Sequence, residues 1–337
     1  MSVAREIKAE LARQKGAALI IVLILVATLS FIVLSLAQVT TLAAHRSLNV
    51  NARQELLWRA FGVEALAAAA IEAVYDKKDI RITPDNQLFS TMHPLPLEEG
   101  AGRVYFVDRT ACFNVNSLVT GNNGDYNSAP AAKAEFLALA QSAGLSAGEA
   151  LNIVSAITDW LDTDNGVQPG GAEDGFYAGL PAPYRTGQTL LADLSELRAM
   201  NGVTREIFNT LQPYLCVQPE AAPSKVNVNF LTPDRAPVLV GLLQGQISMA
   251  DALAIIDARP PGGFTDAKAF ETILGAYYTP SSDGANPAAG RFDVRSAYIA
   301  VQSELELGPA ALDVSMVYAI DSAGKAQLLS RAFGGGL

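Results

Sequence analysis

Residues 14–44 read QKGAALIIVLILVATLSFIVLSLAQVTTLAA, and no Asp, Glu, Lys or Arg stands between Lys15 and Arg46. About 20 apolar residues suffice for a helix to cross a bilayer, so this run is long enough to span a membrane. The competing interpretation is a cleaved signal peptide, whose apolar core would be about 7–15 residues long and followed by a small-x-small site. Ala37 and Ala43 keep such a site open, but the length of the run favours a retained membrane helix.

The charges that flank the apolar run predict its orientation. Before the run stand four basic and two acidic residues: Arg5, Lys8, Arg13 and Lys15 against Glu6 and Glu10. Because basic flanks remain on the cytoplasmic side of a membrane, the N-terminus is expected in the cytoplasm and the rest of the chain is expected to be exported.

The remainder of the chain has the composition of an acidic globular protein. The formal net charge is −10 over 337 residues, a length that suggests about two domains. This charge disfavours binding to a nucleic-acid backbone. The two cysteines, Cys112 and Cys216, could form a disulfide in an oxidising compartment or remain separate buried thiols, and the sequence leaves both open.

The helical pattern continues beyond the membrane run. From His45 to Tyr75 the chain has no proline and one glycine, so one helix over 17–74 would be about 87 Å long. The apolar positions that recur in its second half predict a face packed on a sheet: Leu48, Ala52, Leu56, Phe61, Ala65, Ala68 and Ile71. A partner protein could instead contact Trp58, Phe61 and 67–70, although packing on the sheet is favoured for the later of these residues.

Strand patterns flank a block of helical patterns. Strands are expected at 103–107, 292–307, 311–320 and 326–330, with a turn at 321–325. Short helices are expected at 133–144, 146–161, 193–200, 204–215, 236–243 and 248–258. The predicted fold class is therefore α+β, in which a long N-terminal transmembrane helix packs on an antiparallel sheet and a large all-helical domain is inserted.

The domain limits follow from this alternation. The transmembrane helix is placed at 17–44 and the first part of the sheet domain at 45–125. The inserted helical domain is placed at 126–284, and the C-terminal strands at 285–337, with a return linker over 281–290. Two segments echo each other, CFNVNSL at 112–118 and VNVNFL at 226–231, each an extended Asn-x-Asn step before a turn.

Several motifs then match one family in order and spacing over nearly the whole chain. They are Gln14–Ala17 before the apolar run, DRTACFNVN at 108–116, DWLDTD at 159–164, GAE at 171–173, PYR at 183–185, LSELR at 194–198, VNVN at 226–229 and FDVRS at 292–296. With these motifs the chain resembles the K-type minor pseudopilins of the bacterial type II secretion system.

The resemblance implies a processed, pilin-like subunit. A prepilin peptidase would cleave after Gly16 and remove the leader 1–16, and the new first residue, Ala17, would be N-methylated. The chain would then be a single-pass protein of the inner membrane with a periplasmic C-terminal part. Most pilin-like chains carry Glu at mature position five, whereas this chain has Ile21 there. An ionisable residue in a membrane run is kept for a partner, so its absence fits a subunit at the fibre tip.

The resemblance also implies a function and partners. The expected role is a non-enzymatic subunit at the tip of the pseudopilus, which initiates fibre assembly and supports export of folded proteins from the periplasm. Its expected partners are the I- and J-type minor pseudopilins and the major pseudopilin.

One acidic stretch could hold a metal. The segment 159–174, DWLDTDNGVQPGGAED, contains five carboxylates: Asp159, Asp162, Asp164, Glu173 and Asp174. Hard oxygen ligands on a flexible loop suit calcium, although the spacing is not that of an EF-hand. A solvated acidic loop is the alternative. The resemblance implies calcium in the inserted domain, with Asp162, Asp164 and Glu173 as the foremost ligands.

Catalysis has little support in the sequence. His45 lies beside the membrane run and His93 stands near prolines, and no hydrolase, metalloprotease or phosphate-loop motif occurs. The alternative function is a membrane-anchored periplasmic DNA-binding protein of competence type, because 194–202 and 254–270 are similar to helix-hairpin-helix modules. The acidic surroundings favour protein contacts and no nucleic acid.

Overall fold

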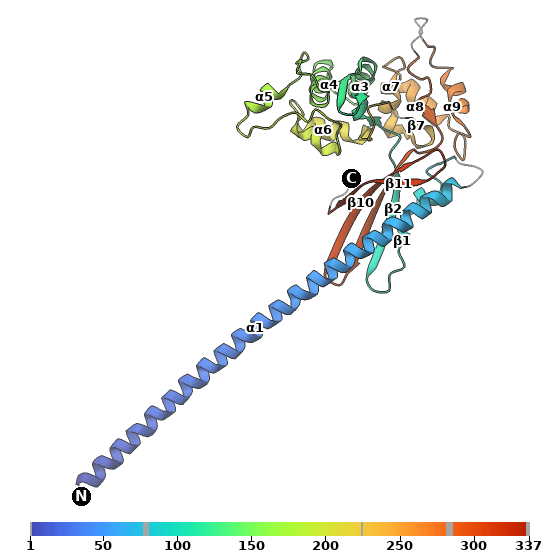
Figure 1. Cartoon of the computed structure of the whole chain (residues 1–337). Coiled ribbons are helices and arrows are strands. Elements are labelled where there is room, and N and C mark those ends of the chain that lie inside the picture. Colours follow the sequence, from blue (N-terminus) through green and yellow to red (C-terminus); the bar gives the residue numbers. More distant parts are fainter. Residues whose placement is uncertain (1, 77–80, 224, 281–285, 335–337) are drawn as a thin grey trace.

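The computed structural model describes residues 2–76, 81–223, 225–280 and 286–334, and for 2–16 it describes the backbone only. Half of the predicted return linker, 281–285, lies outside the described residues. The N-terminal helix α1 runs from Ser2 to Tyr75, so it is a rod of about 110 Å (Figure 1). It begins earlier than the predicted start at 17, because residues 2–15 are rich in Ala, Glu, Lys and Arg and contain no Gly or Pro.

The stretch predicted to cross the membrane is exposed on all sides. Its most apolar part has a mean hydropathy of 3.1 and no buried residue, and among the residues that the structure describes it is the only helix of this kind. By length and composition this helix can cross a bilayer.

A five-stranded antiparallel sheet lies against the C-terminal third of α1. Its strand order is β1-β2-β9-β10-β11, in which every pair of neighbours is antiparallel. The strands are β1 His93–Pro94, β2 Ala101–Asp108, β9 Tyr298–Leu307, β10 Ala310–Ile320 and β11 Ala326–Phe333. The predicted α+β class and the antiparallel sheet are confirmed.

One face of α1 packs on this sheet, and it coincides only in part with the predicted face, since Leu56 and Ile71 are buried as expected whereas Phe61 is not. The buried positions recur at steps of four and three: Leu56, Ala60, Val63, Ala67 and Ile71. The predicted face included a five-residue step from Leu56 to Phe61, which turns the side chain away from the sheet. Phe61 is accordingly 42% exposed and Trp58 is 73% exposed, so neither packs under the sheet.

The helical unit forms a second layer that lies clear of α1 (Figure 1). Its α-helices are α3 Pro130–Ser142, α4 Ala147–Leu161, α5 Asp174–Ala178, α6 Arg205–Leu211, α7 Ala236–Leu242, α8 Met249–Asp257 and α9 Ala267–Leu274. The 3₁₀ helices are η1 Val115–Leu118, η2 Leu194–Ala199, η3 Gln212–Tyr214, η4 Val228–Phe230 and η5 Pro233–Arg235. The predicted helix at 193–200 is thus a 3₁₀ helix, and the one at 204–215 divides into α6 and η3.

Short strands complete the chain. β3 Phe113–Asn114 pairs in parallel with β6 Leu215–Cys216, and β7 Val226–Asn227 pairs in parallel with β8 Phe292–Asp293. β4 Val119–Asn122 and β5 Asp125–Ser128 form a hairpin. A short helix α2, Gln87–Ser90, precedes β1. Sequence patterning did not predict α9, nor α5, this hairpin and α2, of which the last three have elements of only four or five residues, too short for a periodic signal.

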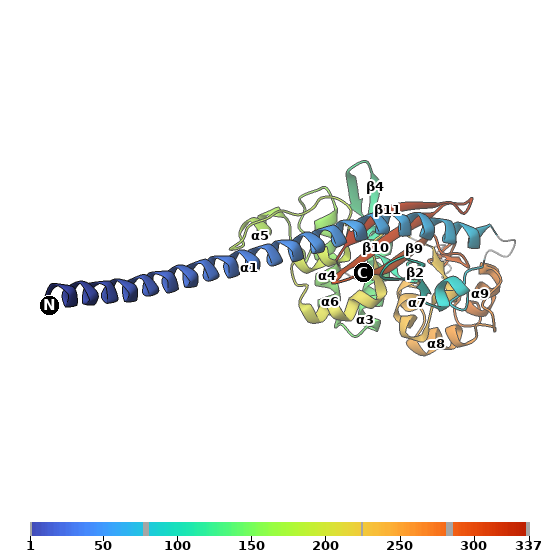
Figure 2. The same ribbon diagram turned by 90° about the horizontal axis from the view of Figure 1, so that it is seen from below.

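The apolar residues divide into two cores, which move the domain limits. The sheet core takes residues from 56–106 and 299–318, and the helical core takes residues from 111–294. Phe113 and Phe292 both belong to the helical core. The predicted limits at 125/126 and 284/285 therefore fall inside the helical unit, and we place its limits close to residues 110 and 295. The sheet and the helical unit together are called the head below, and Figure 2 shows the N-terminal part of α1 extending beyond it.

The two Asn-x-Asn segments hold equivalent places in two related halves of the helical unit. Asn114 accepts a hydrogen bond from the backbone N–H of Asn116, as Asn227 does from that of Asn229. The Asn116 amide bonds both the N–H and the C=O of Leu191, and the Asn229 amide bonds both groups of Phe264. Each half also contains a helix that opens with a capping box, at Ser146 in α4 and Ser248 in α8.

A disulfide joins Cys112 to Cys216 beside the β3–β6 pair. The two cysteines are 104 residues apart in the sequence and both are buried, so the bridge closes the first half of the helical unit into one covalent loop.

The double variant Cys112→Ala/Cys216→Ala should lose about 4 kcal/mol of unfolding free energy, because the unfolded chain regains the entropy of a long closed loop. Guanidinium unfolding of the full chain in a neutral detergent would measure this loss through the fluorescence of Trp160, which is 8% exposed in the helical unit. Reduction of the wild-type disulfide should have the same effect. An unchanged unfolding midpoint would contradict the prediction.

Candidate metal centre

The end of α4 places two carboxylates on one side of the helix. Asp159 and Asp162 are three residues apart, which puts both on the same helical face. Asp162 is the C-cap of α4 and has an extended backbone, so the chain leaves the helix at this residue. After a loop the chain returns to Glu173, the N-cap of α5.

These three carboxylates converge. One oxygen of each of Asp159, Asp162 and Glu173 lies within 4.8 Å of the others, and all three residues are buried, with at most 4% of each exposed. Four of their oxygens are buried without a hydrogen-bond donor: Asp159 Oδ1, Asp162 Oδ1, Glu173 Oε1 and Glu173 Oε2. Buried polar atoms are nearly always hydrogen-bonded, so this cluster has an unmet requirement for positive charge.

The electrostatics lead to the same requirement. Burial, followed by the neighbouring carboxylates, raises the pKa of Asp162 to about 7 and that of Glu173 to about 7. Burial also raises the pKa of Asp159. The charge of Lys133 lowers the pKa of Asp159 and of Asp162, but its ammonium donates a hydrogen bond to the side-chain oxygen of Gln168 and not to either carboxylate.

The loop approaches the cluster closely at a glycine. A Cβ atom on Gly171 would lie 2.1 Å from Asp159 Oδ2, so only glycine permits this approach. The remaining carboxylate oxygens are fixed by Gln168, whose N–H donates to Asp159 Oδ2 at 3.1 Å and whose amide donates to Asp162 Oδ2 at 3.4 Å. Sequence reasoning did not single out Gln168, because a glutamine in an acidic loop carries no distinctive signal.

Two predicted ligands lie outside the cluster. Asp174 is turned away, since its Oδ1 accepts hydrogen bonds from the N–H and hydroxyl of Thr186 at 2.9 and 2.8 Å. These bonds lower its pKa. Asp164 is exposed and accepts a bond from the N–H of Gly166 at 2.6 Å, although its charge still acts on Asp162 and Glu173. Of the five predicted carboxylates, the structure thus brings three together.

The three converging residues fit a hard divalent cation. They supply oxygen donors only, with more negative charge than a buried site tolerates, and these properties suit calcium. A cation there would neutralise the cluster and tie the end of α4 to the start of α5.

The other sequence candidates lie elsewhere. Gly16 and Ala17 are inside α1, about 60 Å before the first residue that packs on the sheet, Leu56. His93 contacts the Leu88 carbonyl at 3.1 Å and packs edge-on against Phe106, which gives it a structural role.

Comparison with known proteins identifies the family. Two family models match, both described as type II secretion system (T2SS), protein K, over residues 111–220 and 226–290. Type II secretion system protein K of Aeromonas hydrophila is 30% identical over 96% of this chain and 98% of its own length. The protein K of Pectobacterium carotovorum subsp. carotovorum is 29% identical over 96% and 97%. A putative protein K of Escherichia coli K12 is 33% identical over 76% and 78%.

A solved structure shares the fold. It is the GspK-GspI-GspJ complex of the enterotoxigenic Escherichia coli type 2 secretion system, with a TM-score of 0.72 and 23% identity, and the match covers 86% of this chain and 100% of that one. The sequence and fold define a minor pseudopilin, a structural class of secretion component. The chain belongs to the protein K family of the type II secretion system.

Calcium should stabilise the wild-type chain, by about 2.7 kcal/mol at a hundredfold excess over its Kd, because a ligand that occupies only the folded state shifts the unfolding equilibrium by this amount. Asp162→Asn removes one charge from the cluster and should abolish most of this gain. Asp174→Asn is the matched control and should retain it, since Asp174 faces Thr186. Thermal unfolding with calcium or with chelator measures the effect. Equal gains in both variants would contradict the site.

In calcium-free buffer, stability should fall as the pH rises from about 4 to about 7. The folded-state pKa of Asp162 and of Glu173 is about 7, above the values of 3.8 and 4.5 for the free groups, so the folded state binds more protons in this range. Their contribution is fully present below pH 4 and is lost as the pH rises through 7. Urea unfolding across this range tests the sign, and saturating calcium should remove the loss near pH 7.

Proposed function

We propose that this chain forms the distal tip of the type II secretion pseudopilus, where it initiates fibre assembly and supports export of folded proteins from the periplasm. One observation carries the proposal: a single straight helix, long enough to cross a membrane, ends in a head that the helical unit enlarges. In a fibre built from parallel rods, such a head obstructs a further subunit above it, whereas the rod beneath remains free to bundle (Figure 1).

The composition of the membrane helix supports a terminal position. Ile21 is 58% exposed and apolar, where most pilin-like chains place a glutamate that neutralises the N-terminal amine of a neighbour. A subunit with no layer beyond it has no such amine to neutralise, so an apolar residue carries no cost there.

Anchoring and processing follow from the same helix. The chain is proposed to lie in the bacterial inner membrane with its N-terminus in the cytoplasm and both cores in the periplasm. A prepilin peptidase would cut between Gly16 and Ala17 and leave an N-methylated Ala17. Because the backbone is helical at this position, the peptidase would have to unwind about one turn to reach the bond.

The proposed partners are the I- and J-type minor pseudopilins, which are named with the matching protein in the solved complex, together with the major pseudopilin. Beyond the membrane run, α1 exposes large apolar side chains suited to neighbouring helices: Leu48 and Val50 before the sheet, and Trp58 and Leu66 on the side that faces away from it. Membership of a pseudopilin family offers no support for the alternative of a competence-type DNA-binding protein.

The metal centre would act structurally in this role. We propose that Asp159, Asp162 and Glu173 bind calcium in the periplasm and hold the 162–173 loop against α4. The loop belongs to the first half of the helical unit only, since α8 in the second half is followed by the short turn 258–263. Calcium would thus stabilise one half of the head.

Native protein purified from membranes should begin at methylated Ala17 and carry the I- and J-type minor pseudopilins with it. Intact-mass and N-terminal peptide mass spectrometry after mild solubilisation would measure both. Gly16→Leu should leave the leader attached. It should also abolish co-purification, because a chain that keeps its leader cannot leave the membrane to join the fibre. A soluble species that begins beyond Ala37, or a processed chain that never carries either partner, would contradict the proposal.

A further inference from the structure

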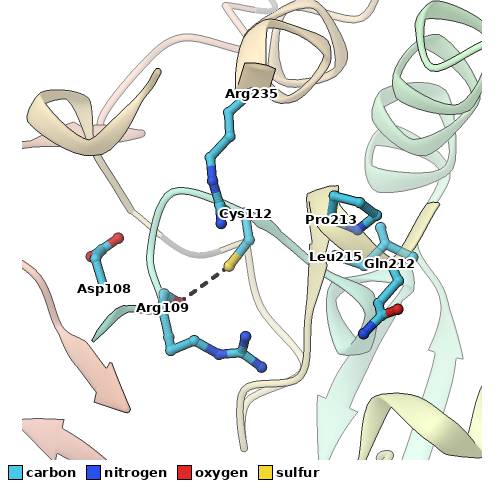
Figure 3. Close-up of a pocket in the computed structure, with 7 residues that line it drawn as sticks. All are labelled: Asp108, Arg109, Cys112, Gln212, Pro213, Leu215 and Arg235. Carbon is cyan, nitrogen blue, oxygen red and sulfur yellow. Dashed lines mark hydrogen bonds between the residues drawn. The ribbon is translucent and has the colours of Figure 1, made fainter. Parts of the chain in front are cut away.

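A polar cavity of about 280 Å³ lies where the sheet meets the helical unit (Figure 3). Its lining comes from the end of β2, the disulfide, η3 and η5: Asp108, Arg109, Cys112, Gln212, Pro213, Leu215 and Arg235. Two guanidinium groups therefore enter one small cavity in a chain whose net charge is −10.

Among the residues that the structure describes, neither guanidinium forms an ion pair, although Asp108 and Asp193 attract Arg109 more weakly than Arg235 repels it. Arg109 is half-buried, and among those residues its side chain forms no hydrogen bond and no ion pair. Arg235 donates one hydrogen bond, at 2.7 Å, to the Ala111 carbonyl. Burial and the nearby Arg235 together lower the pKa of Arg109, so an anion between the two groups would relieve both effects.

Asp108 does not serve as their counterion. Its carboxylate accepts hydrogen bonds from the N–H of Thr110 at 3.0 Å, from the Thr110 hydroxyl at 2.5 Å and from the N–H of Ala111 at 2.9 Å. This carboxylate is thus used to fix the turn after β2, and burial raises its pKa. The two guanidinium groups thus have no ion-pair partner among the residues that line the cavity, since Asp193 stands in the neighbouring groove.

The cavity adjoins a larger groove that could hold a peptide. This groove has a volume of about 570 Å³ and shares Arg109 and Gln212 with the cavity. It runs past Asp193–Arg198 to Leu329 and Ser330 of the edge strand β11. Its mixed polar and apolar walls, with a third guanidinium on Arg198, suit the residues that would flank an anionic side chain in an extended segment.

We propose that the cavity binds the carboxylate of an Asp or Glu side chain carried on an extended segment of a partner protein, between Arg109 and Arg235. Planar guanidinium groups bind carboxylates through paired, charge-assisted hydrogen bonds, and the adjoining groove provides space for the neighbouring peptide. The identity of the partner as a subunit of the same fibre rests on the proposed function, whereas the site itself does not.

The test uses the full chain in dodecyl maltoside and two capped tripeptides, acetyl-Gly-Glu-Gly-amide and acetyl-Gly-Gln-Gly-amide. Saturation-transfer NMR titrations measure binding of each. The Glu peptide should bind about tenfold or more tightly than the Gln peptide, because one charge-assisted contact separates them. Arg109→Met and Arg235→Met should each abolish this preference. Arg205→Met, on an exposed residue of α6 outside both cavities, is the matched control and should retain it.

Folding of each variant is checked by its thermal unfolding midpoint. If Arg109→Met fails to fold, Gln212→Trp replaces it, since a large side chain at this exposed rim position obstructs the cavity and leaves both arginines in place. Equal binding of the two peptides, or a retained preference in a folded Arg109→Met or Gln212→Trp, would overturn the proposal. Binding of sulfate without binding of the Glu peptide would also overturn it, as a site for free anions only. None of these outcomes bears on co-purification with other pseudopilins.

Discussion

The burial of one stripe of α1 against the antiparallel sheet is the contact on which the rest of the molecule depends. Leu56, Ala60, Val63, Ala67 and Ile71 pack there with at most 3% exposed, and a fully buried large apolar side chain contributes about 1.5–3 kcal/mol. Because this stripe and the membrane-length run belong to one unbroken helix, the orientation of the head is coupled to that of the membrane segment. A hinge between the two would remove this coupling.

Buried polar contacts, as well as the covalent chain, join the helical unit to α1 and the sheet. The Asn227 amide donates to the Ile82 carbonyl and to the Ser296 hydroxyl, and the Tyr75 hydroxyl at the end of α1 donates to the Ser296 carbonyl. The end of α1, the segment at Asn227 and the segment before β9 thus meet at Ser296. Such networks are costly when half-formed, so they favour one arrangement of the two cores. The unpaired arginines lie beside this junction, where a bound segment would contact both units.

Much of this architecture could be predicted from the sequence. The apolar run, the strand alternation of 292–330 and the capping residues of α4 and α8 each give a strong local signal, and the fold class followed from them. The buried face of α1 was predicted correctly at Leu56 and Ile71 but not at Phe61, because a five-residue step rotates the side chain by about 140° around the helix axis. We place the domain limits elsewhere than patterning did, because Phe113 and Phe292 join the helical core through contacts distant in sequence. Side-chain direction separated Asp174 from Asp159, Asp162 and Glu173, and composition carries no information on direction.

Electron cryo-microscopy of pseudopili that contain this chain tests the central claim most directly, because the helical unit is large enough to be seen beyond the uniform shaft. The account predicts one extra density per fibre, at the end farthest from the membrane, continuous with a single straight helix below it. Extra density repeated along the shaft, or found at the membrane end, would contradict it.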